Sequence, residues 1–168
     1  MKTRCLVVLA GGGWYEETRR VLALLSPARF EFVYAYAHHS GDHSAATLAL
    51  PHPGPMVPLH YLGYTRPRRF DRLRHAYRTL LALGESRRII RQYRPQAVLA
   101  IGCASAVPLF TAARLQGISC VFIESITRSR ELSLTGRIVY WLRLAKVFVQ
   151  WPRLARRRSR CAYAGAVL

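Results

Sequence analysis

The sequence predicts an α/β protein, a Rossmann-like parallel sheet with helices on both faces. Short apolar runs alternate along the chain with longer segments of helical periodicity, as in doubly wound sheets. The first runs are continuously apolar, as expected of strands that are buried on both faces. A Gly-rich turn joins the first run to the first helical segment, an arrangement that opens many phosphate-binding domains. These three observations set the fold class.

The individual elements follow from the position of the apolar residues. Strands are expected where runs of Val, Ile, Leu and Phe are bounded by Gly, Pro or polar residues. Helices are expected where apolar residues recur every three or four positions. We therefore expect strands at 5–10, 30–35, 57–62, 97–101, 119–123 and 145–150, and helices at 16–25, 66–94, 106–116 and 138–144. Residues 38–58 are expected to form a mobile loop. We expect a single domain over residues 1–168, because no internal repeat is visible.

The composition points to a polyanionic partner. The chain has 168 residues, of which 51% are hydrophobic, so global disorder is not expected. Lys and Arg total 26 against 8 Asp and Glu, which gives a formal charge of +18. Nucleic acid, an anionic membrane and phosphate-bearing substrates all fit such an excess. Nearly all the cations are Arg, whose planar fork suits phosphate.

The cysteines and histidines do not indicate a metal site. The four cysteines are far apart and lack C-x-x-C spacing, so zinc is not expected, and we expect reduced thiols in a cytoplasmic protein. Histidines cluster only in the expected mobile loop, at His38, His39 and His43. We expect neither a metal nor another cofactor.

One uncharged segment approaches the length of a membrane span. Residues 95–113 carry no charge, but Pro95, Gly102 and Pro108 interrupt them, which favours a strand, a loop and a helix. The N-terminal residues lead directly into a strand, and we expect no signal peptide.

An Arg-rich amphipathic segment spans residues 66–94. Ten Arg alternate there with apolar residues at helical spacing, and a second basic cluster follows at 153–160. The pattern is typical of a helix in a membrane interface, although a core-packed helix with a solvated basic face has the same pattern. The candidate membrane-binding residues are Phe70, Arg72, Leu73, Tyr77, Arg78, Arg87 and Arg91. The run 138–144 is apolar on nearly every side, which predicts a helix that is buried, dipped into a membrane or covered by a partner.

A polar motif follows the apolar run at 121–123. Glu124 and Ser125 come directly after this run, and a loop with Arg128 and Arg130 leads to the next helix. Ligands of open α/β sheets bind beyond the carboxyl ends of strands, so the motif predicts a site for an anionic ligand. A structural carboxylate paired with Arg128 or Arg130 is an equally open interpretation of Glu124. Residues that suit a helix cap close the motif, namely Ser133, Thr135 and Gly136.

The same motif carries a resemblance to a known family. It reads IES-x-TR-x-x-x-LS-x-TG over residues 123–136, with VQWP at 149–152, a Gly-rich loop at 11–13, the segment 95–108 and Gly165. It resembles the membrane-anchoring subunit of the two-subunit N-acetylglucosaminyltransferase of dolichol-linked oligosaccharide synthesis. It is equally similar to the bacterial counterparts of this subunit in exopolysaccharide synthesis.

The resemblance implies a division of labour between two chains. This chain would be the N-terminal, acceptor-binding half of a GT-B hexosyltransferase, holding a polyprenyl-diphosphate-linked acceptor. A separate catalytic subunit would bind the nucleotide sugar, and this chain alone would be inactive. The expected location is the cytoplasmic face of the inner membrane, bound peripherally or in the interface.

The family motif also suggests site residues. The Gly-rich loop of the family reads Gly-Gly-His-x-x-Glu, whereas residues 12–17 here place Trp14 at the His position and keep the acid as Glu17. An indole cannot accept a proton, so we predict that Glu17 handles the proton; an acid that favours the helix dipole is the other interpretation. The predicted acceptor- and phosphate-binding residues are Gly11, Gly12, Gly13, Trp14, Ser105, Glu124, Ser125, Arg128, Arg130, Ser133, Thr135 and Gly136.

Two other function classes fit parts of the sequence. A basic nucleic-acid-binding module is suggested by charge alone, but the basic stretches alternate with apolar faces and contain no recognised nucleic-acid motif, so we expect no nucleic-acid partner. A stand-alone nucleotide-binding enzyme would need an acid roughly 20 residues beyond the Gly-rich loop. Glu31 lies near that distance, at the start of an expected strand.

Overall fold

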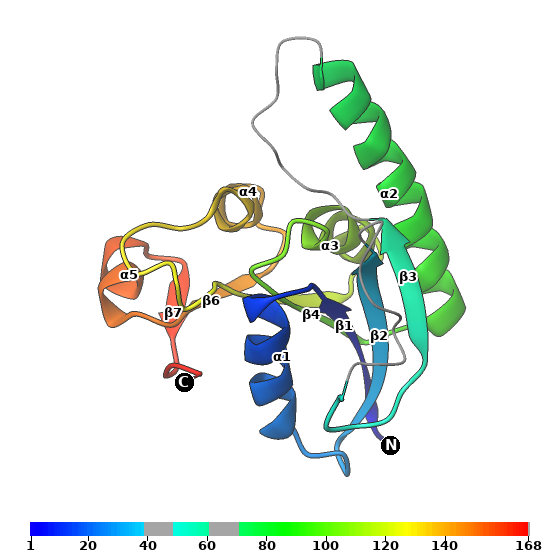
Figure 1. Ribbon diagram of the computed structural model, residues 1–168, viewed down its shortest axis with the longest axis horizontal. Helices are drawn as coiled ribbons and strands as arrows, with labels where there is room; N and C mark the ends of the chain where they lie inside the picture. Colours follow the sequence, from blue (N-terminus) through cyan, green and yellow to red (C-terminus); the bar gives the residue numbers. More distant parts are fainter. Residues whose placement is uncertain (39–48, 61–70, 168) are drawn as a thin grey trace.

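A single parallel sheet organises the protein. The computed structural model describes residues 1–38, 49–60 and 71–167 (Figure 1). Its sheet has seven strands in the order β3-β2-β1-β4-β5-β6-β7, and every neighbouring pair is parallel. The strands are β1 (Thr3–Leu9), β2 (Phe30–His38), β3 (Met56–His60), β4 (Ala97–Ile101), β5 (Ser119–Ile123), β6 (Lys146–Val149) and β7 (Cys161–Tyr163). The helices are α1 (Gly13–Ala23), α2 (Asp71–Tyr93), α3 (Ala106–Arg114), α4 (Leu134–Trp141) and α5 (Pro152–Arg157).

The predicted fold class is confirmed. All six expected strands are present, and the uncharged segment 95–113 forms β4 and most of α3. Within the described ranges, no helix has both the length and the hydrophobicity to cross a bilayer. The prediction missed β7, which has only three residues, and α5, which starts at Pro152. Of the expected mobile loop, residues 39–48 lie outside the described part of the chain, and so do His39 and His43.

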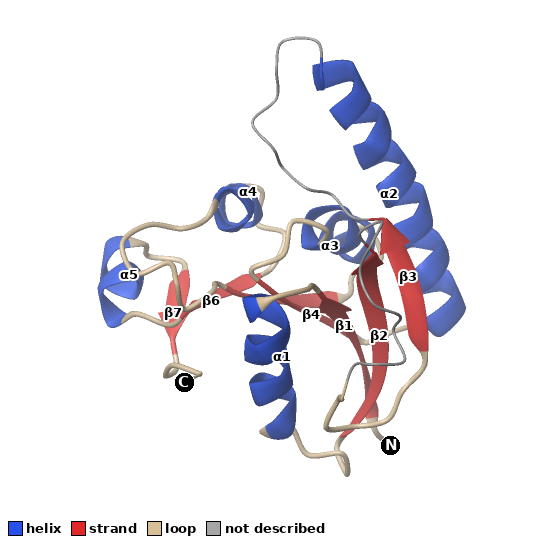
Figure 2. Ribbon diagram, in the orientation of Figure 1, coloured by secondary structure: helices blue, strands red, loops and turns tan. Residues whose placement is uncertain are grey.

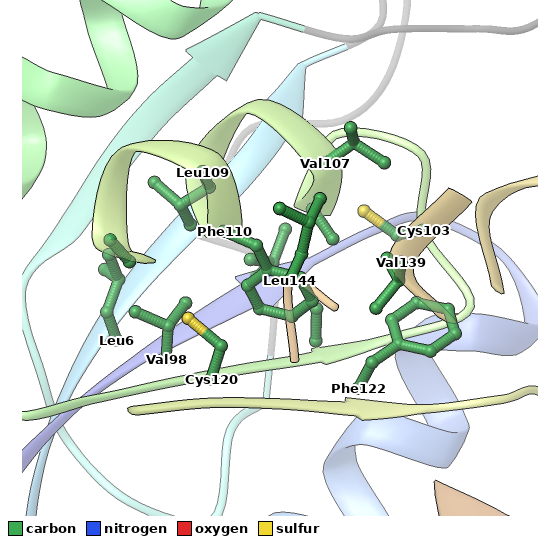
Figure 3. Close-up of a cluster of buried hydrophobic side chains, with 14 of the residues drawn as sticks. Leu6, Val98, Cys103, Val107, Leu109, Phe110, Cys120, Phe122, Val139 and Leu144 are labelled. Carbon is green, nitrogen blue, oxygen red and sulfur yellow. The ribbon is translucent and has the colours of Figure 1, made fainter. Parts of the chain in front are cut away.

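The helices divide between the two faces of the sheet (Figure 2). One face carries α2, α3 and α4 and holds the larger core cluster, in which the Phe110 and Phe122 rings meet edge to face at 6.3 Å (Figure 3). The other face carries α1, whose Leu22 packs with Leu9, Phe32 and Leu99. All four cysteines are buried and free, as expected. The sheet is therefore covered by helices on both faces.

The Arg-rich helix α2 is packed along only part of its length. Its C-terminal half buries Ile89 and Ile90 in the main core. Its N-terminal half projects past the sheet in Figure 1, and Tyr77, Leu80 and Leu81 are 62%, 67% and 44% exposed there. The predicted membrane-binding residues Arg78, Arg87 and Arg91 are exposed, while Arg72 and Leu73 lie in the first turn and Phe70 lies outside the described residues. Among the described side chains of α2, core packing thus buries the apolar residues of the C-terminal half and leaves Tyr77, Leu80 and Leu81 exposed.

Candidate functional site

The candidate site lies at the carboxyl edge of the sheet, around the loops that follow β1, β4, β5 and β6. Strand β1 pairs with β2 on one side and with β4 on the other, so the strand order reverses at β1. Such a switch point is where ligands bind in open α/β sheets. Helix α1 starts here, directly after Gly12, whose φ of 68° is a conformation that glycine adopts without strain.

Glu17 connects three of these loops through one buried carboxylate. The residue is 7% exposed. Its Oε1 accepts a hydrogen bond from Ser125 Oγ at 2.6 Å, and its Oε2 accepts from Ile126 N at 3.1 Å and from Gln150 Nε2 at 2.7 Å. The carboxylate therefore holds α1 against the loops after β5 and β6. Proton handling by Glu17 stays a prediction, while the geometry directly supports a positioning role.

Glu124 is a second buried carboxylate and holds the start of α4. It is 1% exposed and accepts hydrogen bonds from Ser133 N at 2.8 Å, Ser133 Oγ at 3.0 Å and Ser125 N at 3.2 Å. Ser133 Oγ in turn accepts from Gly136 N at 2.9 Å, so Ser133 is the N-cap of α4, as its sequence position suggested. The structural interpretation named Arg128 or Arg130 as the partner of Glu124. The hydrogen bonds to its carboxylate come instead from Ser133 and Ser125, and Arg128 acts on it through its charge.

The protonation of Glu124 makes stability depend on pH. Burial raises the pKa of this carboxyl above its ordinary value, although the hydrogen bonds from Ser133 and Ser125 and the charge of Arg128 lower it in part. A raised folded-state pKa means that the favourable contribution is complete below the unfolded-state pKa and is lost as pH rises through the folded-state pKa.

We therefore expect the wild type to lose stability relative to Glu124→Gln as pH rises above about 4, the ordinary pKa of a glutamate. The amide of the variant cannot ionise. Its altered hydrogen bonds change the free energy of unfolding by an amount that does not depend on pH. Urea unfolding of both proteins across this range measures the difference. Parallel curves of unfolding free energy against pH would contradict the assignment.

Gln150 is a site residue that the sequence reasoning missed. It is 4% exposed and follows β6. Its Nε2 donates to Glu17 and, at 3.1 Å, to the backbone oxygen of Glu124, while its Oε1 accepts from Val167 N at 2.8 Å. The next residue, Trp151, donates from Nε1 to Ile126 O at 2.6 Å. The available signal was a polar residue directly after a buried strand, the same signal that singled out Glu124.

Trp14 lies over the switch point. A Cβ added to Gly102, which has a φ of +59°, would come within 2.7 Å of the Trp14 indole and 3.3 Å of Ser125 Cβ. The indole is therefore in close contact with the loop after β4, and it remains 38% exposed. Of the other predicted residues, Gly11, Gly12 and Gly13 are exposed next to α1, while Ser105 is buried at the N-cap of α3. The structure thus brings Trp14 and Ser125 together.

An arginine-rich pocket of about 320 Å³ opens in the loop between β5 and α4. Its lining includes the predicted Arg128, Arg130 and Ser133, together with Arg137, which the sequence reasoning did not single out. Arg137 pairs with Glu131 at 3.2 Å. Thr135 and Gly136 are buried beneath this surface, and the Gly-rich loop is not part of the pocket lining. Three guanidinium groups around one hollow suit a phosphate or diphosphate group. We name this hollow the arginine pocket.

Comparison with solved structures defines the class of fold. MurG from Acinetobacter baumannii superposes with a TM-score of 0.69 at 19% identity, over 96% of this chain and 45% of that chain. A UDP-N-acetylglucosamine 2-epimerase from Rickettsia bellii superposes with a TM-score of 0.68 at 12% identity, over 99% of this chain and 46% of that chain. The chain therefore has the fold of about half of a GT-B glycosyltransferase.

Comparison of sequences defines the family. The family described as "Oligosaccharide biosynthesis protein Alg14 like" matches residues 5–167, and the chain belongs to it. The UDP-N-acetylglucosamine transferase subunit ALG14 of Mus musculus is 29% identical over a 182-residue alignment, which covers 98% of this chain and 83% of the mouse protein. The ALG14 subunit of Rattus norvegicus is 31% identical over 116 residues, and the match spans 66% of this chain but only 53% of the rat protein. The chain thus belongs to this family, and it spans about half the length of the rat relative.

Proposed function

We propose that this chain is the acceptor-binding subunit of a bipartite hexosyltransferase. It binds a polyprenyl-diphosphate-linked acceptor and recruits a second, catalytic chain that carries the nucleotide sugar. The arginine pocket is the observation that carries this proposal. It presents Arg128, Arg130 and Arg137 beside the switch-point edge of the sheet, where a diphosphate would meet several fork-shaped cations.

The size of the fold supports the division between two chains. The chain corresponds to 45% of MurG, and the ALG14 relatives are named as subunits of a UDP-N-acetylglucosamine transferase. In this proposal the other half of the enzyme is the catalytic subunit. Polysaccharide or exopolysaccharide synthesis is the process that uses the product.

The hydrogen bonds of Glu17 and Glu124 fix the position of the arginine pocket. Glu124 fixes Ser133 at one end of the loop, and Glu17 fixes Ser125 and Ile126 at the other. The loop that carries the pocket arginines is therefore held at both ends by buried carboxylates. Such preorganisation lowers the cost of ordering a cationic site around an anion.

The surface of α2 supports a location at a membrane. Arg78, Arg87 and Arg91 are exposed on the same helix as the uncovered Tyr77, Leu80 and Leu81. Cations near an anionic bilayer contribute on the order of 1 kcal/mol each, within about one Debye length. We propose that α2 binds the protein peripherally to the cytoplasmic face of the inner membrane.

Reconstitution tests the proposed function. We expect the purified chain to transfer no sugar from UDP-N-acetylglucosamine or another nucleotide sugar to a polyprenyl-diphosphate-linked acceptor. Transfer should appear when the catalytic subunit of the same organism is added. Product formation followed by chromatography of the lipid-linked sugar is the measurement. Sugar transfer by this chain without a second chain would overturn the bipartite proposal.

A further inference from the structure

Helix α4 carries an apolar stripe that the described protein does not cover. Leu134, Trp141 and Leu142 are 58%, 64% and 64% exposed. Their spacing of seven and eight residues places them along one side of the helix, with the partly buried Ile138 between them. The opposite side buries Thr135, Val139 and Tyr140. The sequence predicted that the run 138–144 is buried, dipped into a membrane or covered by a partner, and the structure excludes complete burial.

Cations lie on and next to α4. Arg137 and Arg143 are exposed on and just after α4. Arg158 and Arg160 lie over the Tyr140 ring, at 5.8 and 4.3 Å from its centroid, and Tyr140 meets Trp141 edge to face at 5.6 Å. Glu131 is the only acid in the sequence after Glu124. Arg137 pairs with Glu131, and the other three arginines leave an excess of positive charge around the Trp and the leucines. This is the composition of an element in an anionic membrane interface.

We propose that α4 is a second membrane contact, in which Leu134, Trp141 and Leu142 enter the interface of an anionic bilayer. This inference rests on the proposed function and deepens it, because Leu134 also lines the arginine pocket. With α4 in the interface, the pocket lies at the level of the lipid phosphates. A lipid-linked diphosphate would then reach Arg128 and Arg130 while its hydrocarbon chain stays in the bilayer.

The arrangement of the helices fits one continuous membrane-facing side. Helices α2, α3 and α4 lie on the same face of the sheet, and α1 lies on the other (Figure 1). Helix α2, which carries the exposed Tyr77, Leu80 and Leu81, belongs to this face. We assign the salt-sensitive part of binding to the arginines and the salt-resistant part to the apolar stripe of α4.

Vesicle sedimentation separates these two parts. The full chain is mixed with vesicles of phosphatidylcholine and phosphatidylglycerol, or of phosphatidylcholine alone, at low and high salt. The test variant is the double substitution Trp141→Ser and Leu142→Ser. Leu24→Ser is the matched control, because Leu24 is 79% exposed at the end of α1, on the other face of the sheet. A third variant replaces Arg72, Arg78, Arg87 and Arg91 by Gln.

We expect the double variant to lose about tenfold or more of its affinity for anionic vesicles at high salt, with Leu24→Ser binding like the wild type. The Arg variant should instead lose its low-salt affinity and most of its salt dependence. Vesicles with brominated acyl chains should quench the tryptophan fluorescence of the wild type more strongly than that of the Trp141→Phe variant. Equal high-salt binding of wild type and double variant would overturn the inference.

Two further measurements keep this inference separate from its alternatives. A water-soluble short-chain acceptor should bind equally well to the wild type and to the double variant. If the wild type does not bind this acceptor, the proposed function is wrong, while the membrane contact of α4 is still decided by the vesicle measurement. The surface is instead a protein interface, and the inference is wrong, if the double variant keeps its vesicle affinity but no longer binds the catalytic subunit. Thermal unfolding of each variant verifies that the exposed substitutions leave the fold intact.

Discussion

Replacing Glu17 by Gln is expected to slow sugar transfer by the reconstituted enzyme by about 10²–10⁴-fold, the usual contribution of a general base. The same substitution should lower the free energy of unfolding by about 1–3 kcal/mol, because an amide group replaces one of two oxygens that accept from Ser125, Ile126 and Gln150. Glu16→Gln is the matched control, since the Glu16 carboxylate is exposed and pairs with Arg19 and Arg20. Turnover and urea unfolding of both variants give the two effects. Near wild-type turnover in Glu17→Gln would place the base elsewhere.

Gln150→Met separates the two roles of Glu17. This change leaves the Glu17 carboxylate in place and removes one of its three hydrogen-bond donors. If Glu17 acts by holding the loops, Gln150→Met should weaken acceptor binding and stability in the same direction as Glu17→Gln. If proton transfer is the whole role, turnover at saturating acceptor should survive. The split between the Michaelis constant and the turnover number therefore distinguishes positioning from proton transfer.

Replacing Gly136 by Ala is expected to lower the free energy of unfolding by about 2–5 kcal/mol, from overpacking together with a displaced buried carboxylate. The added methyl group would overlap Glu124 Oε2 and lie 3.2 Å from Ser133 Oγ. Glu124 is almost completely buried and cannot move into solvent without losing its bonds to Ser133. Urea unfolding at neutral pH measures the loss.

Gly84→Ala is the control for the glycine substitution. Gly84 lies inside α2, and nothing lies within 4 Å of an added Cβ. Alanine should therefore raise stability slightly, by about 0.5–1 kcal/mol, through its higher helix propensity. If Gly136→Ala changes the free energy of unfolding as little as Gly84→Ala does, then Gly136 does not pack closely against the Glu124 carboxylate.

The fold could be read from local sequence because its central strands are buried on both faces. Runs such as 5–10 and 97–101 contain no charge and are short, which is typical of a strand in the middle of a parallel sheet. The edge strand β7 gives no comparable signal in three residues. Helix α5 was missed although Pro152 stands at its first turn, where proline is favoured. Short elements at the end of the sheet depend on packing more than on local pattern.

The candidate site could be predicted only in part. The motif at 123–136 predicted Arg128, Arg130 and Ser133, which the structure brings to one pocket. The contacts of Glu17 with Ser125 and Gln150 join residues that are 108 and 133 positions apart, so they depend on strand order and register. The exposed side of α4 could not be predicted either, because the same apolar sequence suits a helix packed in a core and a helix in contact with a membrane. Arg137 was overlooked because it lies inside an otherwise apolar helix.

Ligand binding by the purified chain alone distinguishes an acceptor-binding subunit from a subunit that binds the nucleotide sugar. The measurement is titration calorimetry with a water-soluble short-chain polyprenyl-diphosphate sugar and, separately, with a nucleotide sugar. We expect the acceptor to bind, the nucleotide sugar not to bind, and Arg128→Gln with Arg130→Gln to weaken acceptor binding by about tenfold or more. Arg29→Gln with Arg114→Gln, at exposed positions outside the pocket, should bind like the wild type. Binding of the nucleotide sugar in place of the acceptor, or unchanged acceptor binding in the Arg128 and Arg130 variant, would overturn the proposed function.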